Sequence, residues 1–130
     1  MTDKGKPSGL KILVVEDYED TLLLMRIMLE QRGYRVVEAA DGEAAVETAW
    51  RECPDVILMA LSLPKLDGLA ASRRIRDDPQ TRDVVIVAVT AHAEPQYRQN
   101  ALAAGVDAFV TKPIDFNCLD DLLGSLLRGR

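Results

Sequence analysis

Glu16 and Asp17 stand side by side directly after the apolar segment 10–15. Two adjacent carboxylates repel each other, and this repulsion costs stability unless a cation joins them. Carboxylate oxygens are hard ligands, so Mg²⁺ is the natural candidate for that cation. Asp17 could instead simply cap the helix that follows, since aspartate is a common capping residue. The pair alone therefore leaves a metal site and a helix cap open as explanations.

Two further polar groups also follow apolar segments. Thr90 closes the segment 84–89, and Lys112 closely follows the segment 108–110. Taken singly, the threonine could be a helix-entry residue and the lysine a solvated surface charge, which is the default for a lone lysine. Open parallel sheets, however, place their binding sites at the carboxyl ends of the strands. If these segments are strands of one such sheet, the acids, the hydroxyl and the ammonium group lie at one edge.

Short apolar segments alternate with longer helical patterns along the chain. The pattern predicts strands at residues 10–15, 34–39, 56–59, 84–89 and 108–110, and helices at 21–31, 42–50, 68–76, 95–105 and 116–127. Asp41 and Asp115 are suited to cap the second and the last helix, and Trp50 is expected to anchor the second helix by packing. The central segments are apolar at successive positions, as in strands that are covered on both faces. Strict alternation with short connections favours right-handed crossovers and one parallel sheet, an α/β fold.

The length and composition suit a single folded unit. The 130 residues predict one domain, residues 10–128, after a polar and flexible leader, residues 1–9. The formal net charge of −5 weighs against a nucleic-acid surface, which is usually basic. No apolar segment approaches the roughly 20 residues needed to cross a bilayer, and the start has no signal-peptide core. Cys53 and Cys118 are too far apart in the sequence to form a metal motif, which favours a reducing and hence cytoplasmic location.

The segments around the polar groups resemble the receiver (CheY-like) domain of two-component response regulators over residues 10–127. The matching motifs are Val14-Val15-Glu16-Asp17, Pro54-Asp55 through Asp67-Gly68, Val89-Thr90-Ala91, Gly105-Val106-Asp107-Ala108-Phe109 and Thr111-Lys112-Pro113. The resemblance implies a doubly wound (βα)5 fold, a flavodoxin-like three-layer sandwich with parallel strands in the order 2-1-3-4-5. It also implies a single-domain signalling protein of a two-component phosphorelay, and not an enzyme.

The resemblance assigns a Mg²⁺ site to the acidic pair. Asp17 would bind the ion directly, Glu16 would bind it directly or through water, and the backbone carbonyl of Ser62 would be a further ligand. Asp55, just before the third strand, is expected to fix a turn and not to bind metal.

The resemblance also assigns roles to residues after the last two strands and within the fifth. Lys112 would pair with one oxygen of a phosphoryl group and Thr90 would hydrogen-bond another, contacts that stabilise charge in phosphoryl transfer. Phe109 resembles the switch aromatic whose side chain swings inward when Thr90 moves. The Lys112–Pro113 peptide bond is expected to be cis, an isomer that is energetically accessible only before proline.

Ala60 departs from the family at the position that normally carries the phospho-accepting aspartate. A methyl group cannot attack phosphorus, so phosphoryl transfer from a histidine kinase should be blocked. The metal also loses a carboxylate, so Mg²⁺ binding should be weakened, and Lys112 should turn toward Asp17. We favour an engineered Asp-to-Ala substitution that locks the unphosphorylated state, because the rest of the site is retained. The alternative is a natural pseudo-receiver that acts as a phosphorylation-independent protein-binding module.

The resemblance implies protein partners. These are a histidine kinase or phosphotransfer protein, and a downstream protein on the face formed by the fourth helix, the fifth strand and the fifth helix. A weak homodimer is a further alternative, whereas direct nucleic-acid contact and membrane insertion are not expected. A phosphotransferase or phosphatase with small substrates would need a nucleophilic aspartate, for which Asp17 is the only candidate. A flavin or nucleotide binder is disfavoured, because the chain has no Gly-rich phosphate loop.

Overall fold

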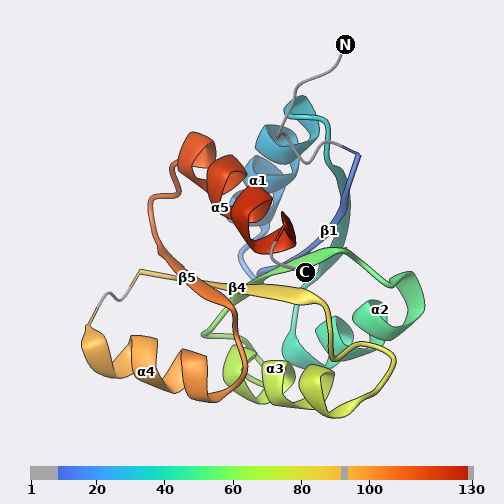
Figure 1. The fold of residues 1–130 in the computed structure, drawn as a ribbon, viewed down its shortest axis with the longest axis vertical. Helices are drawn as coiled ribbons and strands as arrows, with labels where there is room; N and C mark the ends of the chain where they lie inside the picture. The colour runs from blue at the N-terminus through green and yellow to red at the C-terminus, as the bar shows by residue number, and fades with distance from the viewer. Residues whose placement is uncertain (1–8, 92–93, 129–130) are drawn as a thin grey trace.

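The computed structural model describes residues 9–91 and 94–128, in which strands and helices alternate along the chain (Figure 1). The strands are β1 Lys11–Val15, β2 Arg35–Ala39, β3 Val56–Ala60, β4 Val85–Thr90 and β5 Ala108–Thr111. The helices are α1 Glu19–Gln31, α2 Gly42–Glu52, α3 Gly68–Asp77, α4 Pro95–Ala103 and α5 Phe116–Arg128. Every predicted element is present, and its ends differ from the prediction by one or two residues at most. Apart from Gly9, the predicted leader lies outside the described residues.

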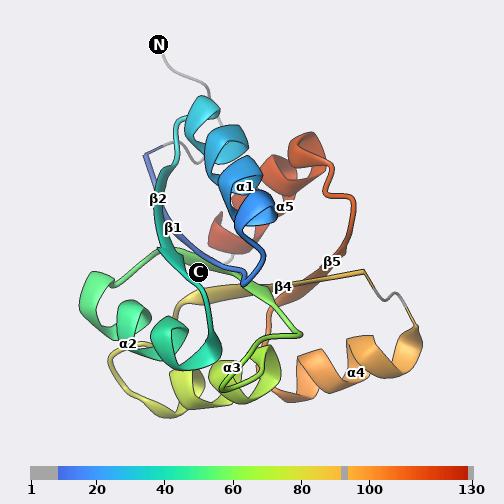
Figure 2. The ribbon, with the colours of Figure 1, turned by 180° about the vertical axis from the view of Figure 1, so that it is seen from behind.

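The five strands form one parallel sheet in the order β2-β1-β3-β4-β5. Helices α1 and α5 cover one face of this sheet, and α2, α3 and α4 cover the other (Figures 1 and 2). The three layers and the strand order confirm the predicted flavodoxin-like fold. Because all strands are parallel, their carboxyl ends meet at one edge of the sheet. The chain adds β2 on one side of β1 and the later strands on the other, so the switch point of the strand order lies between β1 and β3 at this edge.

The sheet has a hydrophobic core on each face, which explains why its central strands are apolar throughout. Leu58 of β3 belongs to the core under α1 and α5, whereas its neighbours Ile57 and Met59 belong to the core under α2, α3 and α4. All residues of β3 and all residues of β4 are buried. A strand that is covered on both faces needs such a continuous apolar sequence.

Aspartate side chains fix the starts of three helices. Asp41 accepts a hydrogen bond from the backbone N–H of Ala44 at 2.7 Å, and Asp67 accepts one from Ala70 at 2.8 Å. Asp115 accepts hydrogen bonds from backbone N–H groups in the first turn of α5. The caps predicted at Asp41 and Asp115 are confirmed, while the cap at Asp67 was not predicted.

A buried carboxylate ties α5 to the loop between α1 and β2. Asp120 is 8% exposed; it accepts a hydrogen bond from the Tyr34 hydroxyl at 2.6 Å and pairs with the Arg32 guanidinium. Burial, and then the hydrogen bond to Asp120, raises the pKa of Tyr34 above its ordinary value. Both carboxylate oxygens of Asp120 therefore have partners, as a buried charge requires.

The prediction that Trp50 anchors α2 was wrong, because its side chain is 53% exposed. The buried residues of α2 are small, and they include Ala45 and Ala49. Trp50 directly follows Ala49, so it lies about 100° further round the helix and points away from the sheet.

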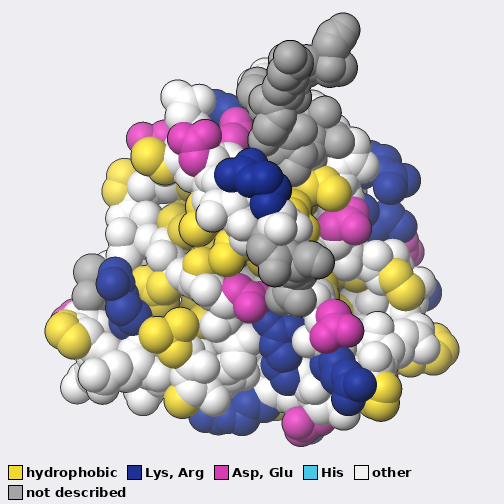
Figure 3. Space-filling view, viewed as in Figure 1, with side chains coloured by type: hydrophobic (Ala, Val, Ile, Leu, Met, Phe, Trp, Pro, Cys, Tyr) yellow, Lys and Arg dark blue, Asp and Glu magenta, His cyan; other side chains and the backbone are white. Residues whose placement is uncertain are grey.

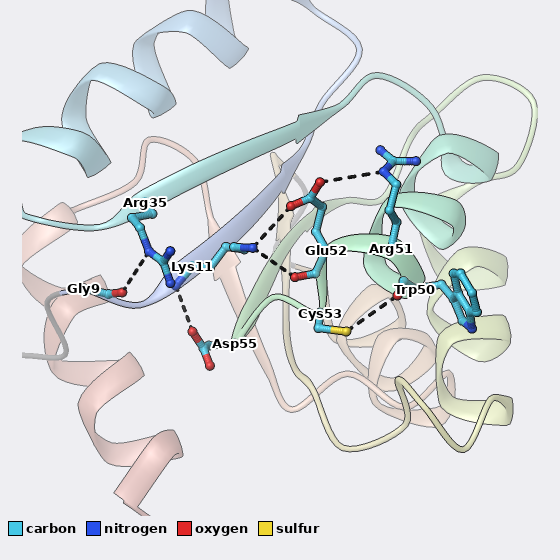
Figure 4. Close-up of polar contacts among 8 residues, drawn as sticks. All are labelled: Gly9, Lys11, Arg35, Trp50, Arg51, Glu52, Cys53 and Asp55. Carbon is cyan, nitrogen blue, oxygen red and sulfur yellow. Dashed lines mark hydrogen bonds and ion pairs between the residues drawn. The ribbon is translucent and has the colours of Figure 1, made fainter.

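Polar contacts close the amino-terminal edge of the sheet, opposite the carboxyl ends of the strands (Figure 4). The Asp55 carboxylate accepts a hydrogen bond from the backbone N–H of Lys11 at 2.8 Å, while the Asp55 N–H donates to the Lys11 carbonyl at 2.8 Å. The Lys11 ammonium also pairs with Glu52 at 3.3 Å. Asp55 thus fixes the start of β3 against β1, at the far edge of the sheet from Glu16 and Asp17.

Replacing Asp55 with alanine is expected to lower the free energy of unfolding by about 1 kcal/mol, because the Lys11 N–H loses its carboxylate acceptor. Urea unfolding should show a lower midpoint at an unchanged slope. Asp55→Asn is the matched control, since its amide oxygen can still accept the bond. Equal losses in the two variants would contradict this role for Asp55.

Candidate functional site

The acidic pair lies at the carboxyl end of β1, and its two side chains differ sharply in burial. Glu16 is 5% exposed, its backbone N–H donates to the Ala39 carbonyl at 3.1 Å, and its carboxylate accepts a hydrogen bond from the Tyr18 N–H at 3.1 Å. Asp17 is exposed. One carboxylate of the pair is thus set into the edge of the sheet, and the other stands in solvent.

Ala60 and Thr90 end the two central strands next to this pair. Ala60 is the last residue of β3 and pairs in register with Val89 of β4. Ala60 is 7% exposed and Thr90 is 8% exposed, so both lie almost completely within the edge of the sheet. The backbone N–H of Lys112 donates to the Thr90 carbonyl at 2.8 Å, which continues the pairing of β4 and β5 past the end of β5.

These strand ends surround an open pocket of about 280 Å³. Its lining comprises Glu16, Asp17, Ala60, Leu61, Ser62, Val89, Thr90, Ala91 and Lys112. Six residues that the sequence singled out therefore meet at one place: the two acids, the alanine, the serine, the threonine and the lysine. The other three are direct chain neighbours of these residues, and all three lie within the motifs that carry the family resemblance.

Lys112 pairs with Glu16, and the prediction that it turns toward Asp17 was wrong. The distance from Lys112 Nζ to Glu16 Oε1 is 3.2 Å. Glu16 lies inside the pocket, whereas Asp17 is exposed, and an ion pair gains more where less water screens it. The Lys112–Pro113 peptide bond is cis.

Phe109 does not line this pocket. It is partly buried against the core under α2, α3 and α4, and the Arg98 guanidinium lies 5.5 Å from the centre of its ring. Thr90 also borders a second hollow of about 430 Å³, which Tyr97 and Asn100 of α4 help to line. Sequence reasoning missed these two residues, because the helical pattern gives no sign of which α4 side chains reach the strand ends.

The loop between β3 and α3 presents Ser62 to the pocket, and its two ends are held together. The Gly68 N–H donates to the Leu61 carbonyl at 2.9 Å, and Lys65 adopts a left-handed backbone conformation with φ of 67°. A side chain could not be accommodated at Gly68, because a Cβ atom there would lie 2.1 Å from the carbonyl oxygen of Ala60. The start of α3 therefore packs directly against the end of β3 at Ala60.

The helices within residues 9–91 and 94–128 all lack the combination of length and apolar character that crossing a membrane requires.

Comparison with known proteins identifies the class of domain that this site belongs to. Residues 12–123 match the family described as the response regulator receiver domain. The chain therefore belongs to the receiver family, whose members act in two-component signalling, and the prediction of that family from the sequence is confirmed.

Two relatives illustrate the sequence similarity. The chain is 38% identical over 118 residues to the response regulator PleD of Caulobacter vibrioides, covering 91% of this chain but 26% of PleD. It is 33% identical over 103 residues to the polar-differentiation response regulator DivK of Brucella anthropi, covering 79% of this chain and 84% of DivK. The chain thus spans about a quarter of the length of PleD and most of the length of DivK.

Solved structures show the same fold. The receiver domain of the sensor histidine kinase PA1611 from Pseudomonas aeruginosa, crystallised with a magnesium ion in its active site cleft, superposes with a TM-score of 0.86 at 40% identity. This match covers 93% of this chain and 99% of the PA1611 domain. The chemotaxis protein CheY4 of Vibrio cholerae gives a TM-score of 0.81 at 27% identity, over 93% of this chain and 98% of CheY4.

Proposed function

We propose that this domain is a receiver whose phosphorylation is blocked at Ala60. The observation that carries the proposal is the place of the Ala60 methyl group, which ends β3 and lines one pocket with Glu16, Asp17, Thr90 and Lys112. An aspartate at this position would be the nucleophile of a receiver. A methyl group has no electron pair with which to attack phosphorus.

The retained residues suit the charge that phosphoryl transfer develops. In a receiver with an aspartate at position 60, a carboxylate oxygen bonds to phosphorus as the bond from phosphorus to the kinase histidine nitrogen breaks, and that nitrogen keeps the bonding electrons. The Lys112 ammonium and the Thr90 hydroxyl border the pocket in which the phosphoryl oxygens would lie. Both groups can stabilise negative charge there. In this chain the supporting groups remain, but the bond to phosphorus cannot form.

The donors in the pocket fit a weakened Mg²⁺ site. Glu16 and Asp17 offer carboxylates and Ser62 offers a backbone carbonyl, the oxygen ligands that Mg²⁺ prefers. Within the described part of the chain, no three acidic, histidine or cysteine side chains form a group that could hold a metal ion. An ion bound by two carboxylates would keep several water ligands and would neutralise charge on a phosphoryl group. The magnesium ion in the PA1611 receiver domain supports this assignment.

The partners we propose are proteins: a histidine kinase or phosphotransfer protein, and a downstream protein on the face formed by α4, β5 and α5. That side of the molecule carries hydrophobic, basic and acidic side chains intermixed (Figure 3). Mixed surfaces suit protein partners better than nucleic acid, and the net charge of −5 agrees. The same face could also support a weak homodimer.

Without a phosphoryl group the domain should remain mainly in its inactive conformation, because phosphorylation is what would shift the equilibrium toward the active conformation. Thr90 and Phe109 are the proposed switch pair, and the contact of Phe109 with Arg98 places it next to α4. The retention of Glu16, Asp17 and Lys112 around Ala60 supports an engineered replacement. The second candidate is a natural pseudo-receiver that binds partners without phosphorylation. The alanine at position 60 is also the observation that supports it.

Intact mass after incubation with acetyl phosphate and Mg²⁺ tests the proposal. Ala60→Asp is expected to gain one phosphoryl group, while the chain with Ala60 stays unchanged. Ala60→Asn is the matched control, since it has the shape of aspartate without the nucleophilic charge. A mass gain in the unmodified chain, or none in Ala60→Asp, would overturn the assignment of position 60.

A further inference from the structure

The Glu16 carboxylate is already bonded at both oxygens from within the chain. Its Oε1 lies 3.2 Å from Lys112 Nζ, and its Oε2 accepts a hydrogen bond from the Tyr18 N–H at 3.1 Å. The side chain is 6% exposed, so little water competes with these partners. A metal ion that bound Glu16 through Oε1 would therefore have to displace the Lys112 ammonium group.

The contact between Lys112 and Glu16 reaches across the sheet. Lys112 follows β5 and Glu16 follows β1, and the strand order places β3 and β4 between them. The lysine side chain must therefore pass over the ends of those two strands, and β3 ends in the Ala60 methyl group. A methyl group offers the ammonium no carboxylate on the way, so Glu16 becomes its partner.

We propose that Lys112 acts as an internal cation that competes with Mg²⁺ for Glu16. Ala60 then weakens metal binding in two ways, by removing one carboxylate and by diverting Lys112 onto another. The inference rests on the proposed Mg²⁺ site and concerns how this chain regulates it. An ammonium group and a divalent ion cannot share one carboxylate oxygen without strong repulsion.

Competition of this kind is reciprocal. If Lys112 lowers the affinity of the site for Mg²⁺, then bound Mg²⁺ must weaken the contact between Lys112 and Glu16 by the same factor. The side chain of Lys112 is 36% exposed even when it is paired. Its release should therefore be detectable by an amine-reactive reagent.

Titration of Mg²⁺ by calorimetry tests the proposal on the chain as it stands and on Lys112→Met. The variant is expected to bind Mg²⁺ about tenfold more tightly, because Glu16 loses its ammonium partner and its Oε1 becomes available to the metal. Lys112→Arg keeps the charge and should retain the weak affinity. Lys65→Met is the matched control: Lys65 lies in the loop after β3 and pairs with Asp41 at 3.8 Å, so it reports general charge removal.

A double substitution separates competition for Glu16 from general repulsion. In a Glu16→Gln background, Lys112→Met should improve Mg²⁺ affinity no more than Lys65→Met does. An undiminished tenfold gain in that background would overturn the proposal. Binding that is equal in the unmodified chain and in Lys112→Met would overturn it while leaving the Mg²⁺ site intact. Absence of binding in every variant would overturn the site and the proposal together.

Amine labelling gives a second readout on the unmodified chain, independent of any substitution. Saturating Mg²⁺ should increase the rate of modification at Lys112 several-fold, as measured by peptide mass, with little change at Lys65. A Lys112 rate that does not respond to saturating Mg²⁺ would contradict the competition.

Discussion

Replacing Gly68 with alanine is expected to destabilise the domain by about 2 kcal/mol or more, although alanine is the better helix former. Gly68 is the first residue of α3, and a Cβ atom there would lie 2.1 Å from the Ala60 carbonyl oxygen and 2.8 Å from the Leu61 Cα. Both are backbone atoms, so the end of β3 or the start of α3 must move. Helix propensity alone predicts that the free energy of unfolding rises by up to about 1 kcal/mol. The sign of the measured change therefore shows whether the steric clash or the helix propensity is the larger effect.

Urea unfolding of Gly68→Ala measures this effect, with Gly9→Ala as the matched control. Gly9 has a positive φ of 84° but nothing within 4 Å of its Cβ position, so its replacement reports backbone strain without a clash. Amide chemical shifts of Ser62 and Thr90 should also move in Gly68→Ala, because the contact positions the loop that lines the pocket. A variant at least as stable as the parent would show that the loop yields at no cost.

The sheet could be predicted from the sequence because its determinants are local or are shared by whole strands. Every residue of β3 and β4 is buried, and a strand that is covered on both faces has to be apolar throughout. The caps at Asp41 and Asp115 depend on hydrogen bonds to residues two or three positions away. Patterns of this kind can be recognised without knowledge of tertiary contacts.

The features that could not be predicted depend on side-chain contacts between distant elements. Lys112 could reach either acid of the pair, and only the burial of Glu16 in the folded pocket decides between them. Trp50 fits the spacing of an amphipathic helix, yet the inner face of α2 is formed by small residues such as Ala49. The contribution of Tyr97 to the hollow beside Thr90 likewise depends on where α4 packs.

Replacing Ala60 with aspartate is expected to lower the free energy of unfolding of the metal-free domain by about 2 kcal/mol. Ala60 is 7% exposed and lines the pocket that also holds Glu16, which is 5% exposed. A second carboxylate at this depth would be poorly solvated and would repel the first. Lys112 can compensate part of this charge, but its ammonium already pairs with Glu16 at 3.2 Å.

Mg²⁺ should offset this loss, because a ligand that binds only the folded state stabilises it, and does so more the more tightly it binds. Thermal unfolding in EDTA and in saturating Mg²⁺, with Ala60→Asn as the uncharged control, measures both effects. The rise in Tm with Mg²⁺ should be larger for Ala60→Asp than for the parent, and Ala60→Asn should lose less stability in EDTA than Ala60→Asp. If Ala60→Asp were as stable as the parent without metal, Lys112 would have to satisfy two carboxylates at once, and repulsion within the acidic cluster could not be what metal binding relieves.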